Sequence, residues 1–471
     1  MSDVDKRTIR NKPLKRIRLL FILMFIGLMA NILYFVIVQA DQVVINDYNP
    51  RMAEIEAGVM RGDILDRSGR PLATSVIRNG QQVRVYPFGS LFAHSVGYTG
   101  VGNTGIEAYN NLDLIRSNNN FKDRLTDVFN WDLGQGNSVI TTFDADLQQL
   151  ASDLLGEQRG AIVAMDPMTG EILAMVSKPD FDPNTIESTY EALMGDQDSA
   201  TFLNRASQGL YPPASTYKIL TTISYLEEHK AANFFHYCEG QLFVGQKVIH
   251  CYNNHAHGRI SLEEAFALSC NTAFAKMEAD IDVDRLNAIS ELFFYNESMP
   301  LEIATKDSSF ELTSESSPNE IVETIIGQGK TLITPLNNVM IASAVANQGV
   351  SMQPFISKQV VSDEGEVVSV TESKAYRTIM TPAMAATIEG YMIETSRMGT
   401  AKALDTTSYD IASKTGTAEN SQGAAHAWYI GYAPANNPQI ALAILVENVG
   451  SSTENSVPIA DALYKYYVTS N

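Results

Sequence analysis

The sequence is poor in cysteine, tryptophan and basic residues. Its 471 residues include 3 cysteines and 2 tryptophans, and 34 lysines and arginines stand against 54 aspartates and glutamates, for a net charge of −20. Such an acidic chain is a poor partner for nucleic acid, so we set nucleic-acid binding aside. No long repeat or low-complexity tract stands out. The length and the 45% hydrophobic content are sufficient for two or more globular domains.

The cysteines leave three states open. Cys238 and Cys251 lie in one polar loop region and would be the natural pair for a disulfide in an oxidising compartment, whereas Cys270 lies in a separate apolar segment. Free thiols are an equal alternative. A cluster of candidate zinc ligands is also present: His250, Cys251, His255 and His257. Its spacing matches no standard zinc pattern, so we predict no metal site and no cofactor.

One long apolar run is present, at residues 19–38, with Asn31 as its only strongly polar member. At 1.5 Å per residue its length matches a bilayer core of roughly 30 Å. Seven of the basic residues precede it, within the first 18 positions. We predict a cytoplasmic tail (1–18) and a single-pass transmembrane helix (19–39), with the acidic remainder outside the cell membrane. The alternatives are a signal peptide cleaved near Val38-Gln39-Ala40 and a buried core helix.

The region after about residue 140 is predicted to form one α+β domain. Asp144 is a suitable N-cap for a helix whose leucines at 147, 150, 154 and 155 share a face. Residues 160–177 read as two apolar strands joined by a turn at 167–170, and residues 428–447 read as a second pair joined at 435–438. Helical patterns fill much of the sequence between the pairs, so distant parts of the chain should share one sheet.

Ser215 and Lys218, in the stretch YPPASTYKIL, are the first candidates for chemistry. Three residues apart, they would share a helical face. Ser215 could simply cap the helix, but a capping box places Glu or Gln where this chain has Lys218. An ammonium in the first helical turn faces the positive end of the helix dipole, which opposes its charge. Burial and the dipole would lower the lysine pKa, so that Lys218 could take the proton of Ser215 during attack.

Two further candidates follow along the chain. Ser269 and Asn271 interrupt an apolar segment, where polar groups need partners of either a structural or a catalytic kind. The stretch from Lys414 to Thr417 (KTGT) precedes the last strand pair and occurs once. On an edge strand, its cation and hydroxyls would suit a substrate carboxylate, and Gly416 would admit a close backbone. The alternative for this stretch is a surface turn with incidental charge.

Ser-x-x-Lys, Ser-x-Asn and Lys-Thr-Gly, in this order, are the motif set of the penicillin-recognising serine acyltransferases. The chain resembles a class B penicillin-binding protein, a monofunctional peptidoglycan D,D-transpeptidase, and is most similar to the compact A-type proteins of Gram-positive bacteria. Other segments agree with this resemblance: Arg61-Gly62, Gly105-Ile106-Glu107, Thr142-Phe143-Asp144, Gly327-Gln328-Gly329 and Ala427-Trp428-Tyr429-Ile430-Gly431. Ala214 departs from the family, which usually has glycine before the nucleophile.

The resemblance implies an α+β fold: a pedestal (40–143) carries a transpeptidase domain (144–471) with an antiparallel sheet between helices. It also implies that Ser215 attacks the penultimate D-alanine of a D-Ala-D-Ala stem peptide, with Lys218 as base. Ser269 would relay a proton to the leaving D-alanine, and Asn271 would orient the substrate amide.

By the same resemblance, Lys414, Thr415, Gly416 and Thr417 would bind the substrate, the lysine through its charge and the threonines through the terminal carboxylate. β-Lactam antibiotics would acylate Ser215. A membrane glycosyltransferase of the SEDS class would be the partner in the membrane. A D,D-carboxypeptidase that uses water as acceptor, and a penicillin-binding scaffold or sensor with little catalytic role, are the alternatives.

Overall fold

The computed structural model describes residues 3–34, 59–116, 134–196, 198–245, 247–406, 408–420 and 423–470. The chain divides into two units, Met1–Val59 and Met60–Asn471. Each is described here by itself.

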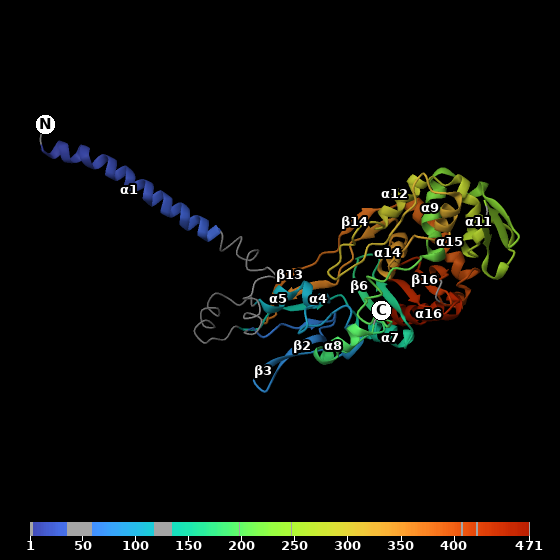
Figure 1. Cartoon of the computed structure of the whole chain (residues 1–471), viewed down its shortest axis with the longest axis horizontal. Helices are drawn as coiled ribbons and strands as arrows, with labels where there is room; N and C mark the ends of the chain where they lie inside the picture. The colour runs from blue at the N-terminus through green and yellow to red at the C-terminus, as the bar shows by residue number, and fades with distance from the viewer. Residues whose placement is uncertain are drawn as a thin grey trace. The chain divides into compact units, whose positions relative to one another are not determined.

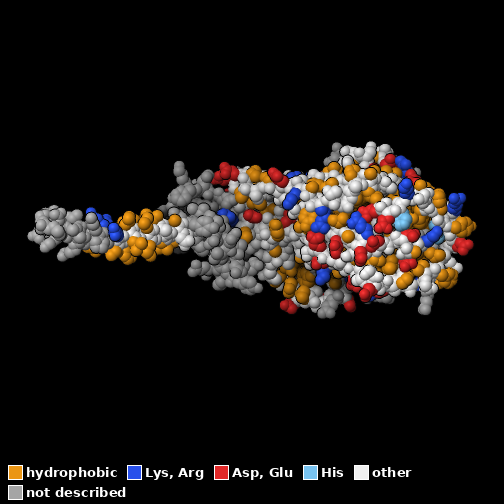
Figure 2. All heavy atoms as spheres, turned by 90° about the horizontal axis from the view of Figure 1, so that it is seen from above, with side chains coloured by type: hydrophobic (Ala, Val, Ile, Leu, Met, Phe, Trp, Pro, Cys, Tyr) orange, Lys and Arg blue, Asp and Glu red, His pale blue; other side chains and the backbone are white. Residues whose placement is uncertain are grey.

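The first unit contains helix α1 (Asp3–Tyr34). Its large apolar side chains between positions 14 and 32 are exposed, and Phe25, for example, is 67% exposed. Figure 2 shows them as one hydrophobic stretch beside a group of cations. In the part of the chain that the structure describes, no helix has both the length and the apolar character needed to cross a membrane. The predicted span continues past Tyr34, and residues 35–39 lie outside the described residues.

The second unit is built on a five-stranded antiparallel sheet, in the order β15-β16-β17-β5-β6. Its strands are β5 (Gly160–Met165), β6 (Ile172–Lys178), β15 (Ala412–Ala418), β16 (His426–Ala433) and β17 (Ile440–Val446). Both predicted strand pairs are present with their turns. Strands β17 and β5 join them, with Val446 opposite Gly160 and Ala441 opposite Met165. Distant parts of the chain therefore share one sheet, as predicted.

Helices cover both faces of this sheet (Figure 1). Helices α7 (Ala145–Leu155) and α16 (Ser452–Ser470) pack on one face, where Ile162 and Leu442 belong to the same apolar cluster as Leu147. Helix α14 (Pro335–Ala346) packs on the other face, which receives the alternate side chains of the strands. As predicted, Asp144 caps α7, because its carboxylate accepts hydrogen bonds from the N–H groups of residues 146 and 147.

A second, mixed sheet has the order β13-β12-β4-β1-β2-β3. It combines early strands with two from late in the chain: β1 (Ile64–Leu65), β2 (Pro71–Arg78), β3 (Gln81–Val85), β4 (Ser138–Thr141), β12 (Ser357–Val361) and β13 (Val367–Val370). Strand β12 pairs with β4, so the later region contributes directly to the earlier one. The division into residues 40–143 and 144–471 stays a prediction.

Further elements surround the two sheets. The helices among them are α4 (Gly105–Tyr109), α5 (Asn111–Ile115), α8 (Ile186–Gly195), α12 (Val283–Leu292), α13 (Pro318–Ile325) and α15 (Pro382–Arg397). The strands among them are β7 (Phe235–Cys238), β8 (Gln241–Val244), β9 (Lys247–His250), β10 (Gly258–Ser261), β11 (Val350–Met352) and β14 (Ala375–Thr378). β7 pairs with β10, β8 with β9, and β11 with β14, each pair antiparallel.

A buried charge cluster holds the mixed sheet to helix α4. The fully buried carboxylate of Glu107 accepts hydrogen bonds from Arg61 Nε and Arg84 Nε, each at 2.7 Å. Burial alone would raise the pKa of Glu107, but the charges of Arg84 and Arg61 outweigh it, and the net pKa lies below its ordinary value. The segments Arg61-Gly62 and Gly105-Ile106-Glu107, which carried part of the family resemblance, therefore contact each other through an ion pair.

Replacing Glu107 with glutamine should lower the free energy of unfolding by roughly 3–5 kcal/mol, because two guanidinium groups then stay buried without the carboxylate. Urea unfolding of the full-length protein, followed by circular dichroism, measures the change. Asp410→Asn is the matched control, since it removes an exposed ion pair with Arg397 and should cost less than about 1 kcal/mol. Equal losses in the two variants would contradict the prediction.

Candidate active site

Ser215 lies in a tight 3₁₀ turn, Ala214–Thr216, just before helix α9 (Lys218–Glu228). The sequence suggested that Ser215 could cap this helix. The N-cap position is held by Tyr217 instead, and within the described residues no side chain caps α9. Ala214 has a φ of +51°, a left-handed conformation that favours glycine. This conformation explains why glycine suits the position before the serine, and it places Ala214 under backbone strain.

Lys218 is the first residue of α9 and is completely buried. Its Nζ donates hydrogen bonds to the Ser269 carbonyl at 2.9 Å, to the Ser269 hydroxyl at 3.3 Å and to Asn271 Oδ1 at 2.7 Å. Burial lowers the pKa of Lys218 to about 8. About a tenth of this amine is therefore the free base at pH 7, far more than for an ordinary lysine, and the direction of the shift is the one that the sequence predicted.

Ser269 lies at a break between two short helices, α10 (Leu262–Ala267) and α11 (Asn271–Lys276). It also has a left-handed backbone, with a φ of +54°. Its hydroxyl accepts a second hydrogen bond, from Lys414 Nζ at 3.1 Å. Ser269 therefore lies between two lysines, whereas Asn271 contacts Lys218 and the carbonyl of His250. Both polar residues that interrupt the apolar segment have partners.

Strand β15 carries the KTGT stretch and is an edge strand, as predicted. Lys414 is fully buried, and its pKa lies well below the ordinary value, first because of burial and second because of the charge of Lys218. The hydroxyls of Thr415 and Thr417 are in contact with those of Thr400 and Ser452, respectively. The edge strand β15 therefore carries the hydroxyls of Thr415 and Thr417 next to the buried amine of Lys414.

Two glycines allow the strand and a loop to approach the serine turn. A Cβ atom at Gly416 would lie 3.1 Å from Ala214 Cβ, and one at Gly327 would lie 1.7 Å from the Ala214 carbonyl oxygen. Gly327 also accepts a hydrogen bond from the Ala214 N–H at 2.7 Å. Its neighbour Gln328 donates to the Thr417 carbonyl at 3.3 Å. The Gly-Gln-Gly segment therefore fixes the turn that presents Ser215.

These segments line one cleft of about 710 Å³. Six of the eight predicted site residues line it directly, and Lys218 and Lys414 lie buried beneath, joined through Ser269: the lining six are Ser215, Ser269, Asn271, Thr415, Gly416 and Thr417. The structure thus brings all eight together.

Sequence reasoning missed several residues of the cleft. Thr400, Ser452 and Thr453 line it beside strand β15, although they lie in segments without a recognisable motif. Ser452 begins the last helix and donates a hydrogen bond to the Gly416 carbonyl. A serine at a helix start is ordinarily interpreted as a cap, so the sequence carried no signal of its place in the cleft. His250 also lines the cleft, and its carbonyl accepts a hydrogen bond from Asn271.

The arrangement suits acyl transfer through a serine. The Ser215 hydroxyl lines an open cleft three residues before Lys218, whose amine has a lowered pKa, and a second hydroxyl, that of Ser269, bridges this amine to Lys414. Hydroxyls along the edge strand are suited to hold an anionic group of a substrate. Such an arrangement can activate a serine, stabilise negative charge and return a proton to a leaving group.

Two family models match the chain. The penicillin binding protein transpeptidase domain matches residues 160–465, and the penicillin binding protein A dimerisation domain matches residues 61–139. The first covers more than half of the chain and contains all eight predicted site residues.

Relatives match most of the chain. Peptidoglycan D,D-transpeptidase PbpA of Mycolicibacterium smegmatis is 32% identical over 476 residues, covering 93% of this chain and 94% of that protein. Peptidoglycan D,D-transpeptidase MrdA of Escherichia coli K12 is 27% identical and covers 79% of this chain and 69% of that protein. The ceftriaxone acyl-enzyme complex of penicillin-binding protein A from M. tuberculosis superposes with a TM-score of 0.81 at 29% identity, covering 87% of this chain and 98% of that one. The chain therefore belongs to the penicillin-binding protein transpeptidases, as a class B member of the PbpA type.

Proposed function

We propose that the chain is a serine-type peptidoglycan D,D-transpeptidase in which Ser215 is the nucleophile. The observation that carries the proposal is the junction of three sequence motifs at one hydroxyl: Lys218 and Lys414 both donate to Ser269 Oγ, in a cleft that Ser215 lines. PbpA and MrdA, named peptidoglycan D,D-transpeptidases, support the substrate class.

In the first half-reaction, Ser215 Oγ attacks the carbonyl carbon of the penultimate D-alanine. Lys218, as the free base, takes the hydroxyl proton. Backbone N–H groups of Ser215 and Thr417 hold the oxyanion of the tetrahedral intermediate, where one such donor typically contributes about a hundredfold or more in rate. The proton then passes through Ser269 to the nitrogen of the terminal D-alanine, the peptide bond breaks, and D-alanine leaves.

In the second half-reaction, an amine of a neighbouring stem peptide attacks the acyl-enzyme. Its proton returns by the same route to Ser215 Oγ, the ester bond breaks, and a new peptide bond cross-links the two strands. The transfer is balanced, because one peptide bond is broken and one is formed. Water as the acceptor would instead give a D,D-carboxypeptidase, so comparing amine transfer with hydrolysis distinguishes the two activities.

The substrate is positioned by the edge strand. Thr415 and Thr417 bind its terminal carboxylate, and Lys414 supplies positive potential behind them. Asn271 orients the substrate amide, and the absence of a side chain at Gly416 lets the peptide lie close to β15. A β-lactam mimics this peptide and acylates Ser215. The acyl-enzyme complexes of penicillin-binding protein A from M. tuberculosis with ceftriaxone and imipenem support this step.

We also propose that residues 19–39 anchor the chain in the cell membrane, with residues 1–18 in the cytoplasm and the catalytic region outside. The apolar run, the cations before it and the exposure of its side chains support this topology. An anchored transpeptidase acts on strands that are made at the membrane surface. A membrane glycosyltransferase of the SEDS class is the proposed partner, on the strength of the family resemblance.

Mass spectrometry after treatment with penicillin should find one adduct per chain, on the peptide that contains Ser215. Ser215→Ala should abolish the adduct and the transpeptidation of D-Ala-D-Ala peptides, because no nucleophile remains. Ser188→Ala is the control, since this exposed serine lies on α8, and labelling should be unchanged. An adduct on another residue would contradict the assignment.

The acylation rate should rise with pH, about tenfold per unit below the pKa of Lys218, and level off above about 8. The rate rises with pH because the free base is the reactive form and its fraction grows as pH increases. Stopped-flow kinetics with a chromogenic cephalosporin measure the profile. Lys218→Arg should reduce acylation at least about a hundredfold throughout, since a guanidinium stays protonated. Lys465→Arg, on an exposed part of α16, should leave the profile unchanged. A flat profile in the parent protein would refute the role.

Full-length protein should stay with membranes after a wash in alkaline carbonate, and deletion of residues 1–39 should release it. The physical reason is that a spanning apolar helix resists extraction, whereas a peripheral contact does not. N-terminal sequencing supplies the check on the signal-peptide alternative. A mature chain that begins near residue 41, or wild-type protein released by the wash, would rule out the anchor.

A further inference from the structure

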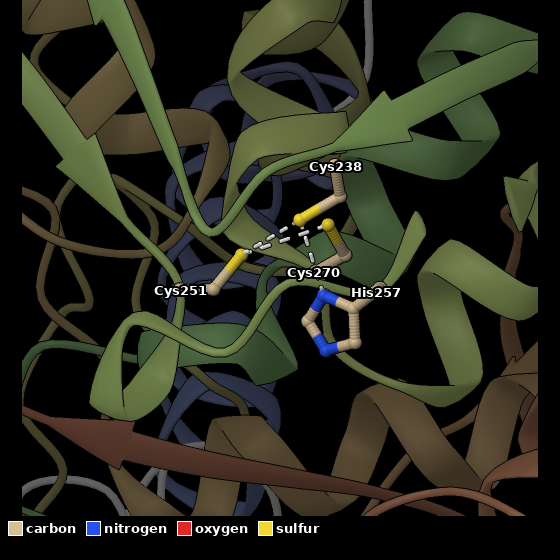
Figure 3. Close-up of side chains that lie close together, drawn as sticks. All are labelled: Cys238, Cys251, His257 and Cys270. Atoms are coloured by element: carbon tan, nitrogen blue, oxygen red, sulfur yellow. Dashed lines mark hydrogen bonds between the residues drawn. The ribbon is translucent and has the colours of Figure 1, made fainter. Parts of the chain in front are cut away.

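Three cysteines and one histidine converge beside the active-site cleft (Figure 3). Their donor atoms all lie within 4.8 Å of one another: Cys238 Sγ, Cys251 Sγ, Cys270 Sγ and His257 Nδ1. They come from separate elements, the end of β7, the residue after β9, the N-cap of α11 and the loop before β10. The sequence placed Cys270 in a segment apart from the other two cysteines, whereas the fold places its sulfur 3.7 Å from that of Cys251.

The spacing of these atoms fits a tetrahedral metal. The sulfur of Cys251 lies 3.6 Å from that of Cys238, and Cys238 Sγ lies 3.3 Å from His257 Nδ1. Ligands about 2.3 Å (sulfur) and about 2.0–2.1 Å (nitrogen) from a tetrahedral zinc ion are roughly 3.6–3.8 Å from each other. A disulfide instead needs about 2.05 Å between sulfurs. The structure records all three cysteines as buried free thiols.

The surroundings of the cluster favour thiolates that hold a metal. The Gly240 N–H donates to Cys238 Sγ at 3.4 Å, and the Thr272 hydroxyl lies 3.3 Å from Cys270 Sγ and 3.7 Å from Cys251 Sγ. His236 Nε2 lies 3.0 Å from the same hydroxyl and so orients it. Hydrogen bonds of this kind fix the ligands of metal sites and tune their charge.

We propose that Cys238, Cys251, His257 and Cys270 bind one Zn²⁺ ion in a Cys₃His site. Three sulfurs and one imidazole nitrogen form a closed ligand set of the structural type. Our sequence prediction of no metal site rested on the spacing of the candidate ligands. The ligands in fact follow the pattern Cys-x₁₂-Cys-x₅-His-x₁₂-Cys. Only the pairing of β7 with β10 and the docking of α11 bring them together.

The metal would position the segment of the cleft that carries Ser269 and Asn271. Cys270 stands between Ser269 and Asn271, so a bond to zinc fixes the backbone that carries both side chains. Asn271 Nδ2 donates to the carbonyl of His250 at 2.9 Å, and His250 directly precedes the ligand Cys251. Zinc therefore ties the loops around β7–β10 to the segment that holds Lys218 through hydrogen bonds. It is a positioning site and contacts no reacting atom.

Metal analysis of the full-length protein in detergent tests the site without any reference to catalysis. Elemental analysis by mass spectrometry should find one zinc per chain after dialysis in metal-free buffer. His257→Ala and Cys238→Ser should each lose most of the zinc. His255→Ala is the matched control, because this neighbouring exposed histidine is no ligand and should leave the zinc content at one. Replacing zinc by Co²⁺ should give the absorption bands of a tetrahedral thiolate complex.

Thiol titration distinguishes the metal from a disulfide. Denatured in chelator without reductant, the protein should expose three reactive thiols. One reactive thiol together with no bound zinc would show a disulfide and overturn the proposal. A wild-type protein that contains no zinc would also overturn the proposal. The same holds if the His257→Ala and Cys238→Ser variants keep their zinc.

A second measurement addresses the positioning role. Removing zinc with a chelator should lower the acylation rate constant of a β-lactam about tenfold to a hundredfold, with a smaller change in its binding constant, because a small displacement of catalytic groups slows the chemical step. Adding zinc back should restore the rate. Unchanged acylation by zinc-free protein would refute this role but not the metal site, and failure of Ser215 labelling in zinc-loaded protein would concern the proposed function alone.

Discussion

Two buried amines that share one serine hydroxyl are the constraint around which the catalytic region is organised. Lys218 and Lys414 are both fully buried, and both donate hydrogen bonds to Ser269 Oγ. Burying charge is costly, so burial lowers the pKa of both amines, and the charge of Lys218 lowers the pKa of Lys414 further. This destabilising arrangement is held by its surroundings, the five-stranded sheet on one side and helices α9 and α11 on the other. The same burial lowers the pKa of Lys218 to about 8, which leaves part of this amine unprotonated near neutral pH.

The backbone around this junction is strained where chemistry is proposed. Ala214 and Ser269 both adopt left-handed conformations that ordinary residues avoid. Gly327 and Gly416 allow close approach to the first of them, and the Cys₃His cluster, if it holds zinc, fixes the second. The two strained residues are therefore held by different means, by tight packing against glycines in one case and by side-chain ligands in the other. In both cases the surroundings hold the residue in a backbone conformation that it would not favour by itself.

Much of the fold and site could be predicted from the sequence. The strand pairs at 160–177 and 428–447 were recognisable from continuous apolar runs, and the helix cap Asp144 was recognisable from its position before a leucine pattern. The eight candidate site residues were predicted through motif order and family resemblance, since each motif alone is weak. The contribution of β12 and β13 to the sheet of β1–β4 was not foreseen, because pairing between strands over 200 residues apart leaves no local pattern. Thr400 and Ser452 were missed because they lie in segments without a recognisable motif.

The cysteines show most clearly what the sequence determines and what only the tertiary structure decides. By itself, the sequence determined which groups can react, namely a serine with a lysine one turn later, two further hydroxyl motifs, three thiols and several histidines. It could not determine distances between groups separated by long stretches of chain. Periodicity and spacing report on neighbours within a helix or strand, whereas contacts between elements depend on how their apolar faces pack. Only the tertiary structure decided that Cys270 lies beside Cys251, with its neighbours Ser269 and Asn271 hydrogen-bonded to Lys218, because packing of the whole domain sets those positions.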